Sequence, residues 1–134
     1  MKSALVDTDI LSLFLRGEPA VVNHFAAYLK AYPRINLSII TYYEIVSGLK
    51  YKDANKQLDR FLELVRNNTL LPLTKRSCDI AADAHARLRK QGKPIDDIDL
   101  LIAGIALENN LVLATRNVGH FDRVEDLIVE DWSQ

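Results

Sequence analysis

Short apolar runs alternate along the chain with longer stretches in which apolar residues recur at helical spacing. The runs at residues 4–6 and 111–114 are closed by Asp7 and Thr115 and predict buried strands. Further strands are expected at residues 35–40, 70–73 and 124–132, and Pro72 favours an edge position for the second of these. Helices are expected at residues 10–16, 19–29, 42–49, 58–65, 77–90 and 99–109.

This alternation predicts the α/β class, as a three-layer α/β/α sandwich with a central, mostly parallel sheet of four to five strands. The 134 residues contain no readable repeat or linker, so a single domain over residues 1–134 is expected. The longest apolar run, residues 100–107, is too short to span a membrane. A single cysteine and the lack of a readable signal peptide make the cytoplasm the expected compartment.

The net charge of −1 conceals two segments of opposite charge. Residues 75–93 carry six basic and two acidic side chains, whereas residues 94–134 carry two basic and nine acidic ones. A basic helix can attract a polyanion even when the whole molecule is almost neutral. The alternative is an ordinary solvated helix face.

Four carboxylates from three segments follow or face the predicted strand ends: Asp7, Glu44, Asp96 and Asp99. Because ligands gather outside the carboxyl ends of parallel strands, we expect these groups to converge. Each also has a purely structural alternative. Asp7 and the acids at residues 96–97 suit helix starts, and Glu44 could form a capping box with Thr41.

Converging carboxylates raise one another's pKa or require a cation. An all-oxygen donor set suits Mg²⁺, and the scattered histidines and lone Cys78 give no zinc-like spacing and no thiol nucleophile. A divalent cation beside a basic helix suits phosphodiester hydrolysis, with a metal-activated water as nucleophile and the helix holding the nucleic-acid backbone.

Six segments, in the same order along the chain, resemble one family, the PIN-domain ribonucleases, and specifically the VapC-type toxins of bacterial toxin–antitoxin pairs. They are residues 5–9, 37–45, 93–104, 113–117, 120–121 and 129–132. The resemblance covers nearly the whole chain, and its most specific block is the segment Lys93 to Gly104.

The resemblance implies a metal-dependent endoribonuclease whose catalytic residues are Asp7, Glu44, Asp99 and Asp96. Asp7 and Asp99 would hold Mg²⁺ or Mn²⁺ directly, and Glu44 would ligate through water or position the nucleophile. Thr8, Ser38 and Thr115 would orient the carboxylates. The chain departs from the commoner family residues at Asp9 and at Asn117, which is neutral.

The resemblance also implies partners: an RNA substrate with tRNA favoured, a VapB-type antitoxin and a second copy of the chain, with no membrane. Two alternatives stay open. Asp7-Thr8-Asp9 also resembles the strand-end motif of haloacid-dehalogenase-type phosphatases, although position 11 is Leu where that motif has Thr. The other is a non-catalytic PIN module that binds RNA or protein, against which the clustered acids count.

Overall fold

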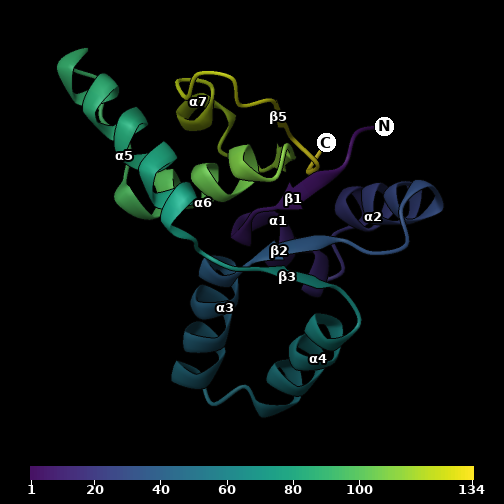
Figure 1. Cartoon of the computed structure of the whole chain (residues 1–134). Coiled ribbons are helices and arrows are strands. Elements are labelled where there is room, and N and C mark those ends of the chain that lie inside the picture. The colour runs from purple at the N-terminus through teal and green to yellow at the C-terminus, as the bar shows by residue number, and fades with distance from the viewer.

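The computed structural model describes residues 1–134 and contains a five-stranded parallel sheet in the order β3-β2-β1-β4-β5 (Figure 1). The strands are β1 (Ala4–Val6), β2 (Asn36–Ser38), β3 (Thr69–Leu71), β4 (Val112–Ala114) and β5 (Val129–Glu130). Leu5 of the central strand pairs with Asn36 on one side and with Leu113 on the other. The predicted parallel sheet and the edge position of the strand before Pro72 are confirmed.

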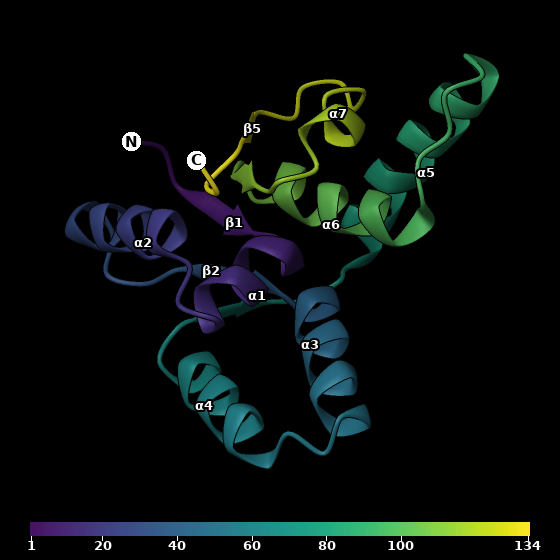
Figure 2. The same cartoon turned by 180° about the vertical axis from the view of Figure 1, so that it is seen from behind.

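Seven helices connect the strands and lie on both faces of the sheet (Figures 1 and 2). They are α1 (Thr8–Leu15), α2 (Pro19–Ala31), α3 (Ile39–Tyr51), α4 (Asn55–Arg66), α5 (Lys75–Lys90), α6 (Asp97–Glu108) and α7 (Val118–Phe121). None of these helices is long and apolar enough to cross a bilayer.

The side chains of β1 alternate between two hydrophobic cores, one on each face of the sheet. Ala4 and Val6 point into a core built with α1, α2 and part of α3 and α4. Leu5 points into a second core built with α5, α6 and α7. The fold is therefore the three-layer α/β/α arrangement expected from the sequence.

The second core requires a glycine where α6 crosses α5. A Cβ atom at Gly104 would lie 2.3 Å from the backbone oxygen of Ser77 and 3.3 Å from the Cβ of Ala81. Real Cβ atoms do not approach a carbonyl oxygen so closely, so the distance between the two helices depends on this residue.

The strand expected at residues 35–40 is wrong at its carboxyl end, because Ile39 and Ile40 belong to α3. The apolar pattern continues across the boundary, but Ser38 turns the chain: its Oγ accepts a hydrogen bond from the Thr41 amide at 3.0 Å and caps the helix. The strand is shortened, and the helix that carries Glu44 starts directly at the carboxyl end of β2.

The order of the strands determines where a ligand can bind. The chain crosses from β1 to β2 on one side and reaches β4 on the other, so β1 lies at the point where the strand order reverses. In open parallel sheets the crevice outside the carboxyl ends at such a point is the usual ligand site. The segments that follow β1, β2 and β4 meet at this edge.

Candidate active site

Asp7 follows β1 and is held in place by three hydrogen bonds. Its amide donates to the Ala114 carbonyl at 2.9 Å, its Oδ1 accepts from the Thr8 amide at 2.8 Å, and its Oδ2 accepts from the Thr115 hydroxyl at 2.8 Å. The side chain caps α1 and is only 6% exposed. Burial, and secondly the charge of Asp9, raise the pKa of Asp7 to about 7 in spite of these hydrogen bonds.

Asp9 links the first turn of α1 to the loop after β4. Its carboxylate accepts from the amides of Ile10 and Arg116, at 2.7 and 3.0 Å, and lies 3.4 Å from the Thr115 hydroxyl. Burial raises its pKa above the ordinary value. Asp9 was not among the predicted site residues, although its spacing of two from Asp7 after a strand is a signal that could have placed it there.

Glu44 is attached to α1 through one hydrogen bond. The Thr8 hydroxyl donates to Glu44 Oε1 at 2.6 Å and lies 2.9 Å from Thr41 Oγ1. The capping-box alternative for Glu44 is therefore wrong, because the Thr41 amide donates to Ser38 instead. Ser38 likewise orients a helix start and makes no hydrogen bond to a carboxylate, whereas Thr8 and Thr115 do orient carboxylates as expected.

Asp96 and Asp99 come from the start of α6. Asp96 caps the helix by accepting from the Ile98 amide at 3.1 Å. The pKa of Asp99 is raised by burial, then by the charges of Asp96 and Glu44, with a smaller opposing effect of His120.

Five acidic residues thus form one carboxylate cluster, consisting of Asp7, Asp9, Glu44, Asp96 and Asp99. The charge of Asp99 raises the pKa of Asp7, and the charges of Asp96, Glu44 and Asp9 raise the pKa of Asp99, so the negative charges act on one another across three chain segments. The convergence expected from the strand order is present.

The loop after β4 adds Thr115 and Asn117 beside the cluster, together with Arg116, whose amide donates to Asp9. The Asn117 amide donates to Thr115 Oγ1 at 3.0 Å, and its side-chain nitrogen lies 3.0 Å from His120 Nδ1. Thr115 is fully buried and connects Asp7, Asp9 and Asn117 through one hydroxyl group.

The donor set of the carboxylate cluster fits a hard divalent cation. All of its ligating atoms are carboxylate oxygens, and their mutual repulsion and burial are the conditions that a cation relieves. No three His, Cys, Asp or Glu side chains are placed closely enough to hold a metal ion together. Mg²⁺ needs fewer protein ligands than that, because it commonly uses one or two carboxylates and completes its shell with water and substrate phosphate.

Comparison with known proteins identifies relatives across the whole chain. The family model described as PIN domain matches residues 4–127. Ribonuclease VapC1 of Haemophilus influenzae (strain R2866) is 34% identical over 132 residues, covering 97% of this chain and 98% of the relative. The tRNA(fMet)-specific endonuclease VapC of Shigella flexneri is 26% identical over 134 residues, covering 99% of this chain and all of the relative.

Solved structures agree. VapBC-1 from nontypeable Haemophilus influenzae has a chain that is 30% identical, superposes with a TM-score of 0.80 and matches over 98% of both chains. These matches favour the first expectation over the phosphatase alternative. The chain therefore belongs to the PIN-domain family, and its similarity to Ribonuclease VapC1 places it among the VapC-type members.

Proposed function

We propose that the protein is a divalent-metal-dependent endoribonuclease of the VapC type, which hydrolyses RNA phosphodiester bonds. The observation that carries this proposal is the carboxylate cluster, held at the carboxyl ends of the strands in a PIN-family chain. The related proteins named as ribonucleases support it.

Asp7 and Asp99 would hold Mg²⁺ or Mn²⁺ directly. When bound, the cation supplies a water of lowered pKa and neutralises charge on the phosphate oxygens. Thr115 fixes the orientation of the Asp7 carboxylate by its hydrogen bond to Oδ2. Asp99 lies in the first turn of α6, and its charge raises the pKa of Asp7.

Glu44 and Asp96 act at the margin of the site. Glu44 would accept a hydrogen bond from the attacking water, and Thr8 holds its Oε1 in place for that purpose. Asp96 accepts from the Ile98 amide through Oδ2, so its other oxygen would be left to accept a hydrogen bond from a water. Thr8, like Thr115, is a positioning residue.

The decisive experiment is RNA cleavage by the purified protein with Mg²⁺ or Mn²⁺. Asp99→Asn removes one charged oxygen donor while keeping the shape of the side chain, and we expect activity to fall by roughly 100-fold or more, as for other charge-stabilising groups. Asp83→Asn, an exposed acid on α5, is the matched control and should retain activity. Excess EDTA should abolish cleavage, and added Mg²⁺ or Mn²⁺ should restore it. Cleavage that survives both EDTA and Asp99→Asn would contradict the proposal.

We further propose that the substrate is tRNA, met in the cytoplasm, and that a VapB-type antitoxin binds the protein, which itself forms a homodimer. The Shigella flexneri relative is named as specific for tRNA(fMet), and the solved Haemophilus influenzae relative is a VapBC assembly. Incubation with total tRNA and with ribosomal RNA, followed by mapping of the new ends, tests the substrate. Cleavage confined to ribosomal RNA would overturn it.

A further inference from the structure

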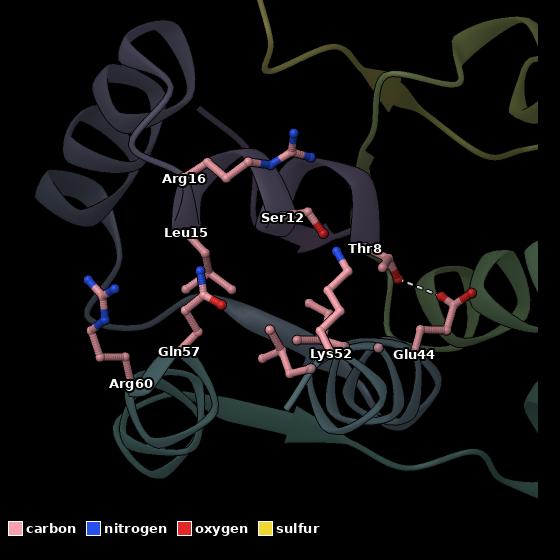
Figure 3. Close-up of a pocket in the computed structure, with 11 residues that line it drawn as sticks. Thr8, Ser12, Leu15, Arg16, Glu44, Lys52, Gln57 and Arg60 are labelled. Carbon is pink, nitrogen blue, oxygen red and sulfur yellow. Dashed lines mark hydrogen bonds between the residues drawn. The ribbon is translucent and has the colours of Figure 1, made fainter. Parts of the chain in front are cut away.

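A groove between α1, α3 and α4 adjoins the carboxylate cluster at Glu44, the one cluster residue in its lining (Figure 3). Thr8 and Glu44, joined by their hydrogen bond, form one end of it. The cavity has a volume of about 400 Å³, which is within the range of sites for nucleotide-sized ligands. Whatever occupies this groove therefore lies next to Glu44.

Three cationic side chains line the groove, one from each helix. Arg16 follows the end of α1, Lys52 follows the end of α3, and Arg60 lies on α4. Lys52 extends from the end of α3 toward α1 across the cavity (Figure 3). None of the three takes part in an ion pair: the four ion pairs of the structure are Arg66–Glu63, Lys75–Asp79, His85–Asp97 and Arg87–Glu125.

The remaining lining favours a polar and anionic occupant. Glu44 is the only acidic residue in the lining, and Ser12 and Gln57 add neutral hydrogen-bonding groups between the cations. Only three of the eleven lining residues are hydrophobic, which is few for a groove that receives the apolar face of a peptide helix. We name this feature the basic groove, defined by Arg16, Lys52 and Arg60.

We propose that the basic groove binds the phosphate backbone of the RNA strand on one side of the scissile bond. The inference rests on the proposed ribonuclease function, and it specifies where the substrate lies. Unpaired cations spaced along a groove attract consecutive phosphates, and the end at Glu44 leads the strand into the carboxylate cluster. Backbone contacts of this kind set the register of a nucleic acid without reading its sequence.

The basic groove is better placed for this role than α5, the helix that the charge pattern singled out. Lys75 and Arg87 of α5 are already paired with Asp79 and Glu125. The carboxyl-terminal end of α5, which carries Arg89 and Lys90, projects away from the sheet in both views (Figures 1 and 2).

The test compares two triple variants that remove the same charge. The groove variant is Arg16→Gln, Lys52→Gln and Arg60→Gln, and the control is Arg76→Gln, Arg89→Gln and Lys90→Gln on exposed positions of α5. Binding of a fluorescent single-stranded RNA is measured at several salt concentrations in an Asp99→Asn background, after circular dichroism has verified folding. We expect the groove variant to bind about tenfold more weakly and to lower the slope of log Kd against log salt by about 2, or about 0.7 for each lost contact. The α5 control should change this slope by less than about 0.7, the value for one lost contact.

The same variants with Asp99 intact separate binding from catalysis. We expect the groove variant to raise KM for RNA with little change in kcat, because it alters no residue of the carboxylate cluster. If both triple variants lose RNA affinity to the same extent, the proposal is overturned in favour of general charge attraction. Binding of a fluorescent acidic peptide is measured with the same variants. If the groove variant keeps its RNA affinity but loses its affinity for this peptide, the proposal is overturned in favour of a protein partner.

These outcomes are distinguishable from failure of the ribonuclease function. If the wild-type protein cuts no RNA while the groove variant still loses RNA affinity, the ribonuclease proposal fails and the groove remains an RNA-binding surface without a scissile bond. If the wild-type protein cuts RNA and the groove variant binds RNA as tightly as the wild type, the groove proposal alone fails.

Discussion

Asp7 illustrates how one residue is placed under opposing electrostatic forces. Two hydrogen bonds favour its charged form, yet burial and the neighbouring charge of Asp9 prevail and raise its pKa to about 7. An unfolded chain gives the same side chain an ordinary pKa of about 4. The folded state therefore holds a proton on Asp7 over a pH range in which the unfolded state has released it.

The expected consequence is a stability that falls as pH rises. Between about pH 4 and pH 7 the folded state binds more protons than the unfolded state, so the free energy of unfolding decreases by up to roughly 1 kcal/mol per pH unit in the absence of metal. The raised pKa values of Asp9 and Asp99 act with the same sign. Urea denaturation in EDTA at pH 5, 6, 7 and 8 measures this decline.

Asp7→Asn is the informative variant for the same measurement. It removes the titrating group at constant shape, so we expect a smaller decline with pH and a metal-free protein more stable than wild type at pH 8. Saturating Mg²⁺ should stabilise wild type at pH 8 and leave the variant almost unchanged, because a cation binds the deprotonated carboxylates. Stability of the wild type that increases from pH 5 to pH 7 would contradict the argument.

At the scale of elements, the contact between α5 and α6 depends on Gly104. Gly104→Ala would place its Cβ against the Ser77 carbonyl oxygen, which is backbone and cannot rotate aside. We expect the helices to be forced apart and the free energy of unfolding to fall by roughly 1–3 kcal/mol, the usual cost of overpacking. Chemical denaturation followed by circular dichroism measures the loss.

Gly48→Ala provides the matched control on α3. Nothing lies within 4 Å of a Cβ built at Gly48, and the residue is within a helix. Alanine there should raise stability by roughly 0.5–1 kcal/mol, because glycine loses more backbone freedom on folding. A loss of similar size in both variants would contradict the assignment of the Gly104 effect to the contact between α5 and α6.

The elements also show how far sequence patterns reach. Hydrophobic periodicity and the Gly and Pro residues at element ends predicted all five strands and six of the seven helices. Both signals are local in the sequence. The boundary at Ser38 was missed because two isoleucines continue the apolar run past it, while the deciding hydrogen bond to Thr41 is visible only in the structure. The convergence of Asp7, Glu44, Asp96 and Asp99 was predictable because strand ends meet at one edge of the sheet. The hydrogen bond from Thr8 that positions Glu44 was not, because it joins residues 36 apart.

At the scale of the whole molecule, basic side chains that are far apart in the sequence lie together in the folded chain. Counting along the chain pointed to residues 75–93 as the nucleic-acid-binding segment. The basic groove instead takes its cations from three helices that carry no unusual local charge, so linear counting could not detect it. The carboxylate cluster and the basic groove share Glu44, whose Oε1 accepts the hydrogen bond from Thr8, so the negatively charged cluster lies beside the positively charged groove.

The carboxyl terminus closes the molecule against α2 through Trp132. The indole is 2% exposed, and its ring lies 5.6 Å from that of Phe25, 5.2 Å from that of Tyr28 and 5.8 Å from that of His24. It belongs to the same core as β1, so the two ends of the sequence stabilise one another.

Trp132→Ala should therefore lower the free energy of unfolding by about 3–5 kcal/mol, a large part of the stability of a typical domain. Because Trp132 is the only tryptophan, unfolding is followed by circular dichroism. If residues 1–134 form one domain, the loss appears as a shift of a single transition with an unchanged denaturant slope. His24→Ala, which removes a partly exposed stacking partner and the hydrogen bond between His24 Nε2 and the backbone oxygen of Gln134, should cost less, about 1 kcal/mol. A second unfolding transition, or equal losses of unfolding free energy in the two variants, would mean that the carboxyl-terminal segment does not fold as part of this core.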